Sequence, residues 1–353
     1  MAIRKQPFGQ LKDGTNLDLY VMTNKQGASV SISNFGGLIT SIMVPDKHGV
    51  LGDVTLGCAD AEHYQPNNGY LGAVIGRVGN RIAGGECVVA GQKLRLAKND
   101  GGINHLHGGD VGFDKYVWQL TPIEGEGEDQ LVLRHVSPDG DEGYPGELRV
   151  TLTYGWNDQC ELSLHYEAAA NKDTLCNLTQ HAYFNLAGQD SGNILDHIIK
   201  INADTITAVS SSECIPTGEF MDVTSTPFDL RQGKRIGDGL AHEHDDTQMI
   251  YGVGYDHNFV ANGTGLREIV VVTEPASGRA MRVSTDMEAV QFYSGNHLNG
   301  KMISPSGKPY MKRAGFCLET QYHPDSINHP NFPDCVLHVG EKYDFSTIYK
   351  FEV

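Results

Sequence analysis

The segment Asn177 to Leu186, NLTQHAYFNL, places a histidine among hydrogen-bonding residues. Successive side chains of a strand point to opposite faces of a sheet, so one face of this segment would be mostly packable and the other wholly polar. The polar face would carry Asn177, Thr179, His181, Tyr183 and Asn185. Two interpretations fit: the face meets water, as antiparallel sheets often allow, or it lines a site for a polar ligand.

A carboxylate occupies a similar setting in the segment FCLETQYH. Read as a strand, this segment points Phe316 and Leu318 to one side and Glu319 and Gln321 to the other. A carboxylate and a histidine held on a rigid sheet are the side chains that general acid–base catalysis requires.

Two further segments repeat the alternation. In GYDHNFV, Asp256 shares a face with Asn258, and His257 lies on the opposite face. In EAVQFYSGN, Gln291 shares a face with Tyr293. Each segment alone fits a half-buried strand with one solvent-exposed face. Together they indicate a polar site assembled from distant parts of the chain.

The segment AVIGRVGNRI carries two arginines among glycines and aliphatic residues, with Asn80 beside the second arginine, Arg81. Glycines permit a close approach of the backbone, and a guanidinium is a fixed fork of donors suited to oxygen-rich ligands. No GxGxxG or GxxxxGK loop occurs here. The amides, hydroxyls and arginines of these segments favour a ligand rich in hydroxyl groups, such as a sugar.

A metal site is the alternative for the segment NHLHGG. His105 and His107 are two residues apart, so on a strand they would share a face and could chelate a metal ion. The other interpretation is one exposed and one hydrogen-bonded histidine beside a glycine turn. No clear carboxylate ligand or third histidine follows at close spacing, which favours the second interpretation and no metal.

The elements that must position these residues are predicted to be strands. Short runs rich in β-branched residues, such as ELRVTLTYGW, CELSLHYEA, HIIKINADTI, EIVVVTEP and RAMRVSTD, alternate with glycine-rich polar turns. His242 to Met249 is the one short helix candidate. This pattern predicts an all-β sandwich or barrel, with residues 1–353 forming a single large antiparallel domain.

Composition excludes several classes of partner. Lys and Arg number 27 and Asp and Glu number 44, which gives a net charge of −17 and argues against nucleic acid or an anionic membrane as partner. The seven cysteines form no CxxC pair and their number is odd, which favours reduced thiols in the cytoplasm. We expect neither a secretory signal nor a membrane span.

The motifs GRVGNRI, NHLHGG followed by GFDK, NLTQHAYFNL, GYDHNF, VQFYSGN and LETQ, in this order, resemble the aldose 1-epimerases, also called galactose mutarotases. The resemblance runs from GGLITSIMVPD to GEKYDFSTIYKF and covers nearly the whole chain. It implies a large antiparallel β-sandwich, the galactose mutarotase-like supersandwich, with an open sugar cleft and no cofactor. It implies interconversion of the α and β anomers of free hexoses such as D-galactose and D-glucose.

The resemblance also assigns roles to residues. Glu319 is implied as the base and His181 as the acid of ring opening, a pair in which carboxylate and imidazolium would stabilise each other. Sugar-binding residues are implied at Asn80, Arg81, His107, Asp256 and Gln291, and strand parity adds Tyr183 and Asn185. Structural hydrogen bonds are expected for His105, His257 and Glu288.

Three departures from the family pattern leave the sugar preference open: Gln180 in place of Asn, His297 in place of Phe, and Val339 in place of Pro. The alternatives to a mutarotase are an epimerase of hexose 6-phosphates, a non-catalytic sugar-binding protein, and a metal-dependent β-barrel enzyme. The first would need a basic cluster for the phosphate, and the second would not need the pair of Glu319 and His181. The oligomeric state is left as monomer or homodimer.

Overall fold

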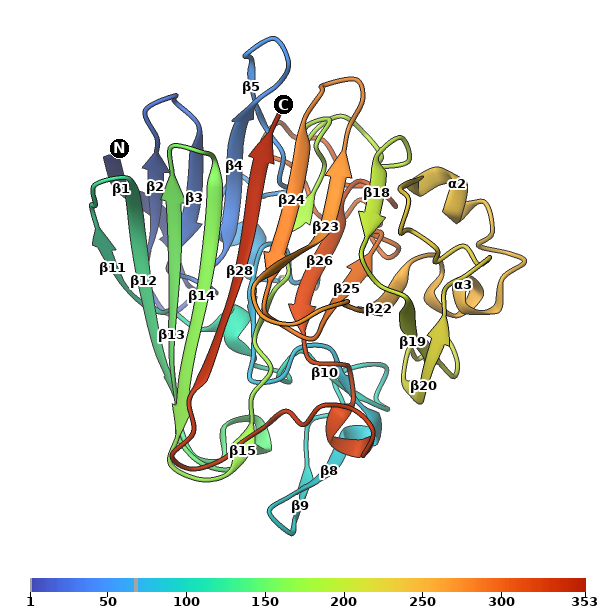
Figure 1. The fold of residues 1–353 in the computed structure, drawn as a ribbon. Helices are drawn as coiled ribbons and strands as arrows, with labels where there is room; N and C mark the ends of the chain where they lie inside the picture. The colour runs from blue at the N-terminus through green and yellow to red at the C-terminus, as the bar shows by residue number, and fades with distance from the viewer. Residues whose placement is uncertain (1, 67–68) are drawn as a thin grey trace.

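The computed structural model describes residues 2–66 and 69–353 and consists mainly of antiparallel strands in two facing layers (Figure 1). Within these residues the α-helices are short: α1 (Ala61–Tyr64), α2 (Ile236–Leu240) and α3 (Thr247–Gly252). The predicted all-β sandwich is therefore confirmed, and its sheets are open rather than closed barrels.

One layer is a nine-stranded sheet with the order β11-β12-β13-β14-β28-β24-β23-β18-β21. Its strands are β11 (Gln119–Ile123), β12 (Glu128–Ser137), β13 (Leu148–Asn157), β14 (Glu161–Ala170), β28 (Tyr343–Glu352), β24 (Ala280–Thr285), β23 (Arg267–Thr273), β18 (Ile198–Ile201) and β21 (Lys234–Arg235). The strand β28, which follows all the others in the chain, lies in the middle of this sheet (Figure 1).

The opposite layer contains two sheets. The first, in the order β1-β2-β3-β4-β5, consists of β1 (Ala2–Gln10), β2 (Asn16–Thr23), β3 (Ser29–Ser33), β4 (Ile39–Pro45) and β5 (Leu51–Asp53). The second, in the order β17-β26-β25-β22-β19-β20, consists of β17 (Tyr183–Phe184), β26 (Phe316–Gln321), β25 (Ala289–Tyr293), β22 (Asp256–Val260), β19 (Thr205–Val209) and β20 (Pro216–Asp222).

Short two-stranded ladders accompany these larger sheets. They pair β6 (Val74–Ile75) with β16 (Thr179–Gln180), β7 (Arg81–Ile82) with β10 (His105–Leu106), β8 (Glu86–Val89) with β9 (Gln92–Arg95), and β15 (Thr174–Leu175) with β27 (Val336–Leu337). Single turns of 3₁₀ helix span Ala83–Gly85, Phe113–Lys115, Asp141–Gly143 and Ser326–Asn328.

The largest core lies between the layers. Phe292 of β25 and Leu318 of β26 are fully buried in the same cluster as Tyr349 of β28, whose hydroxyl donates to the Leu318 carbonyl. Alternation along each strand sends these apolar residues inward, so the intervening residues point to the other face of the six-stranded sheet. That other face carries the polar residues singled out in the sequence.

Most predicted strands are present, with two local differences. HIIKINADTI is not one strand, because Asn202 to Asp204 separate β18 from β19, and these belong to different layers. The helix expected over His242 to Met249 begins later, at Thr247, because Asp246 accepts a hydrogen bond from the Met249 N–H as the N-cap.

All seven cysteines are free and buried, as expected for reduced thiols. Among the described residues, no helix has the length and apolar character that crossing a membrane would require.

Candidate active site

The floor of the site is the polar face of the six-stranded sheet. Glu319 on β26 lies opposite Gln291 on β25, and Gln291 lies opposite Asn258 on β22. The Gln291 Nε2 donates to Asp256 Oδ1 at 2.7 Å. These side chains occupy the strand faces that alternation predicts, and the sheet holds two carboxylates and an amide in fixed positions.

The segment Asn177 to Leu186 delivers His181, but it is not the continuous strand that its pattern predicted. The chain leaves β16 after Gln180 and enters β17 at Tyr183, so His181 lies between two sheets. Its backbone N–H donates to the Ala73 carbonyl at 2.9 Å. The five residues of the predicted polar face are all at least 95% buried, so the interpretation of a wet face is wrong.

His107 reaches the same site from the turn that follows β10. Its φ of +51° departs from strand geometry, so it does not share a face with His105 as the spacing had predicted. His105 is instead held in the interior, with Nδ1 at 2.8 Å from the Ala97 carbonyl and Nε2 at 2.6 Å from the Tyr144 hydroxyl. The expected structural hydrogen bonds of His105 are therefore confirmed.

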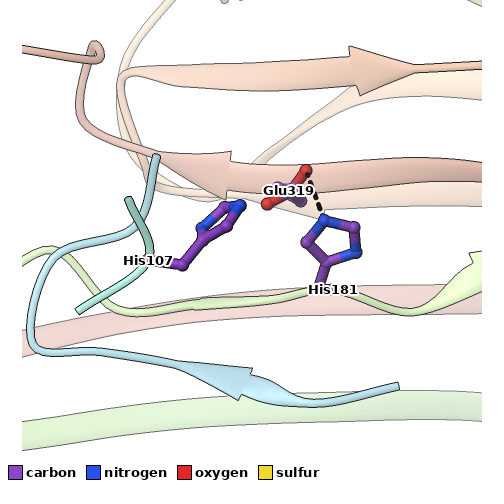
Figure 2. Close-up of side chains that lie close together, drawn as sticks. All are labelled: His107, His181 and Glu319. Atoms are coloured by element: carbon purple, nitrogen blue, oxygen red, sulfur yellow. Dashed lines mark ion pairs between the residues drawn. The ribbon is translucent and has the colours of Figure 1, made fainter. Parts of the chain in front are cut away.

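His181 and Glu319 face each other, and His107 points toward them (Figure 2). The distance from His181 Nε2 to Glu319 Oε1 is 3.7 Å. The three side chains are nearly inaccessible, and Glu319 Oε2 has no hydrogen-bond partner among the described residues. A carboxylate oxygen without a partner, beside an imidazole, is available to a ligand hydroxyl.

Burial dominates the protonation of this pair. Burial lowers the pKa of His181 to about 4, and burial together with the nearby Asp256 raises the pKa of Glu319 well above its usual value. Burial therefore favours the neutral form of both groups over the mutually stabilised ion pair that was expected. The neutral pair nevertheless holds the same single proton as the ion pair, so one proton transfer converts one form into the other.

His107 has a defined tautomer. The Asn80 backbone N–H donates to His107 Nδ1 at 3.1 Å, and burial followed by the proximity of His181 lowers the pKa of His107 well below its usual value. A neutral imidazole whose Nδ1 accepts a hydrogen bond must carry its proton on Nε2. His107 therefore presents an N–H donor to the site.

The same tautomer bears on metal binding. Ligand atoms of His107, His181 and Glu319 lie within 4.8 Å of one another. A metal-bound imidazole presents a bare nitrogen to the ion and donates with the other nitrogen, whereas His107 accepts with Nδ1. The trio is arranged for proton transfer and hydrogen bonding rather than for holding an ion.

A cleft of about 630 Å³ opens above the trio. The volume lies in the range of small-molecule sites. Among the predicted residues, those that line it are Asn80, Arg81, His107, His181, Tyr183, Asp256 and Glu319. The Arg81 Nε donates to Asp100 Oδ2 at 2.8 Å, which orients the guanidinium along the cleft wall.

Two predicted binding residues do not line the cleft. Asn185 is fully buried and donates to the Ala314 carbonyl at 2.9 Å. Gln291 is buried and donates to Asp256, which does line the cleft. Parity had placed Asn185 with His181, but the chain has left the strand between them.

Three further residues that were considered from the sequence lie away from the cleft. The Arg77 guanidinium is buried and donates to Ser137 and to the carbonyls of Pro138 and Gly146, so it ties loops together. His257 packs against Phe228 on the core side of its strand. Glu288 is exposed.

Sequence reasoning missed much of the rim. Tyr70 packs edge-on against His107 with ring centroids 4.5 Å apart, and nothing in the surrounding sequence signalled it. Tyr293 also lines the cleft: alternation placed it on the same face as Gln291, but no role in binding was predicted for it. The outer cleft is lined by His63, Asp100, His297, Leu298, Asn299, Lys301 and Met302.

Comparisons with known proteins agree with this geometry. The family model described as aldose 1-epimerase matches residues 18–350. The galactose mutarotase of Homo sapiens is 43% identical over 353 residues, covering 100% of this chain and 99% of that protein. The aldose 1-epimerase of Escherichia coli (strain K12) is 36% identical and covers 96% of both chains. The solved galactose 1-epimerase from Lactobacillus acidophilus NCFM superimposes with a TM-score of 0.87 at 27% identity, covering 99% of this chain and 98% of that one.

Proposed function

The chain belongs to the aldose 1-epimerase family, whose members are isomerases that interconvert the anomers of aldoses, and from this premise we propose how its residues carry out that reaction on free hexoses such as D-galactose and D-glucose. The observation that carries the proposal is the buried pair of His181 Nε2 and Glu319 Oε1, 3.7 Å apart below an open cleft. Binding alone needs no such pair.

Ring opening requires two proton movements. Glu319 removes the proton of the C1 hydroxyl, and His181 Nε2 delivers a proton to the ring oxygen. The bond between C1 and the ring oxygen breaks with its electrons on that oxygen, and C1 becomes an aldehyde. Each positioned acid or base can supply roughly 10²–10⁴-fold of rate acceleration.

Ring closure reverses the roles. After rotation about the C1–C2 bond, His181 takes the proton back from the hydroxyl at the former ring oxygen, and Glu319 returns its proton to the carbonyl oxygen. The proton count of the pair is the same before and after turnover. The residues thus require no cofactor for a complete cycle.

The remaining cleft residues bind and orient the sugar. His107 donates its Nε2–H to an oxygen near the reacting carbon. Asp256, held by Gln291, accepts hydrogen bonds from sugar hydroxyls, while Asn80 and Arg81 donate to others. Tyr183 contributes an aromatic wall beside His181, with ring centroids 5.1 Å apart. Buried free thiols fit a reducing compartment, and we place the enzyme in the cytoplasm.

Polarimetry of freshly dissolved α-D-galactose tests the proposal, with wild type, Glu319→Gln and Glu288→Gln in a buffer that does not itself catalyse mutarotation. Wild type and Glu288→Gln should reach the equilibrium rotation quickly, because Glu288 is exposed and does not line the cleft. Glu319→Gln should follow the buffer blank. Wild type no faster than the blank with several free aldoses would refute the proposed activity.

A further inference from the structure

His181 has a second partner on the side of its ring that faces away from Glu319. Its Nδ1 lies 3.5 Å from the sulfur of Cys317. Cys317 precedes Glu319 by two residues on β26, so both side chains point to the same face of the sheet. One strand therefore supplies a partner to each nitrogen of His181.

The donors and acceptors around Cys317 can be assigned by starting from the Gly69 carbonyl, which contacts Tyr183. The Tyr183 hydroxyl lies 3.0 Å from the Gly69 carbonyl, which can only accept, so the hydroxyl donates to it. The Tyr183 oxygen then remains free to accept. The Cys317 thiol is in hydrogen-bond contact with Tyr183, and burial raises the pKa of the thiol well above its usual value, so the sulfur keeps its proton.

With these donors and acceptors, the sulfur can act as an acceptor toward His181. If the S–H of Cys317 donates to the Tyr183 oxygen, its lone pairs face Nδ1 of His181 and can accept the Nδ1–H. We propose that Cys317 is a positioning residue that keeps a hydrogen on Nδ1 of His181, so that Nε2 is the nitrogen that exchanges a proton with the sugar. The role of Cys317 in turnover rests on the proposed mutarotase function.

The tautomer matters in ring closure. After opening, His181 is neutral and must accept a proton at Nε2, which is possible only if the remaining hydrogen is on Nδ1. In the other tautomer Nε2 is already protonated and closure is blocked. The Nδ1–H and the S–H are unchanged through the cycle, so Cys317 consumes no proton and no electron.

A thiol suits this task because it is a weak acceptor. A carboxylate at this position would stabilise the imidazolium and oppose its deprotonation in each opening step. The titratable and charged groups facing His181 come from several elements: Glu319 and Cys317 on β26, Tyr183 on β17, Tyr293 on β25, Asp256 on β22, Arg81 on β7, His107 after β10, and Tyr70. Cys317 is the member of this set in contact with Nδ1.

Nuclear magnetic resonance of the enzyme with ¹⁵N-labelled histidine measures the tautomer directly. The His181 signals are identified by their loss in His181→Gln. At neutral pH, without sugar, wild type should show a protonated Nδ1 and a bare Nε2. A protonated Nε2 with a bare Nδ1 would overturn the proposal.

Kinetics test the consequence for turnover. Cys317→Val keeps a strand-compatible side chain but removes the acceptor, and it should lower kcat about tenfold while KM changes less than twofold. Tyr183→Phe frees the thiol hydrogen to turn toward Nδ1, so it should lower kcat as well. Because both changes interrupt the same hydrogen-bond chain from Tyr183 through Cys317 to His181, the double variant should have about the same kcat as each single variant. Cys317→Ser should recover part of the activity.

Cys87→Val is the matched control, because Cys87 is also a buried thiol on a strand but lies in a separate core cluster. It should keep the wild-type kcat. A folded Cys317→Val with wild-type kcat would overturn the proposal. Wild type without mutarotase activity would refute the proposed function alone, since the NMR measurement still decides the tautomer.

Discussion

At the scale of single residues, Glu319 combines a functional requirement with a cost in stability. Its carboxyl is buried, and one of its oxygens has no hydrogen-bond partner among the described residues. Its pKa is raised in the folded state, so the folded chain favours the protonated form and stability falls as pH rises above the usual carboxyl pKa of 4.5.

Glu319→Gln should therefore stabilise the protein at neutral pH while removing activity. The expected gain in unfolding free energy is about 1–3 kcal/mol, because the amide is neutral at every pH and avoids the cost of keeping a buried carboxyl protonated above its usual pKa. Urea unfolding of both proteins at neutral pH and near pH 4 measures it, and the gain should shrink at the lower pH. Glu288→Gln, an exposed change, should alter stability by no more than ~0.5 kcal/mol.

The same pair predicts the pH dependence of catalysis. The active form carries one proton shared by His181 and Glu319. A second proton is added only when the pH falls to the His181 pKa of about 4, and the single proton is lost only well above the usual range of a carboxyl. The value of kcat/KM, corrected for the buffer blank, should be flat around neutral pH and fall near pH 4. An acid limb near the ordinary histidine pKa of 6.5 would contradict it.

At the scale of elements, the turn after β10 sets the position of His107. Gly108 follows with a φ of +87°, and a Cβ there would lie 1.8 Å from the Gly76 carbonyl oxygen. The turn thus packs directly against the segment that leads to Asn80 and Arg81. A side chain at Gly108 therefore requires either the turn that carries His107 or the Gly76 segment to move.

Gly108→Ala should therefore lose both stability and activity. Gly102→Ala is the matched control, since Gly102 has a φ of +73° but open space around its missing Cβ. The control should lose about 1 kcal/mol through backbone strain alone and keep its kcat. Thermal unfolding and polarimetry of the two variants distinguish the effect of backbone strain, which both variants share, from that of the steric clash with Gly76, which only Gly108→Ala has. Equal losses in both would show that the contact with Gly76 is unimportant.

The elements also show what the sequence could predict. Alternation assigned Asp256, Gln291 and Glu319 to the polar faces of their own strands correctly, because β22, β25 and β26 are regular strands. It failed for Asn185 and for His105 with His107, where the backbone leaves strand geometry through tertiary contacts that no local pattern encodes. The roles of His181 and Glu319 came from the family resemblance rather than from periodicity.

At the scale of the whole molecule, the largest core joins the layers. Trp118 and Trp156 belong to the same buried cluster as Phe292 and Leu318 beneath the active site. A single domain over residues 1–353 should then unfold in one step. Tryptophan fluorescence, circular dichroism and mutarotase activity should be lost at one urea concentration. Activity lost well before the tryptophan signal would indicate separate folding units.

The central place of β28 has a consequence for synthesis. The ribosome makes β14 and β24 long before residues 343–352, which must insert between them to complete the nine-stranded sheet. Until those residues emerge from the exit tunnel, each strand carries an unpaired edge open to wrong partners. A nascent chain halted just before Tyr343 already holds His107, His181 and Glu319, yet it has no completed sheet to keep them in place.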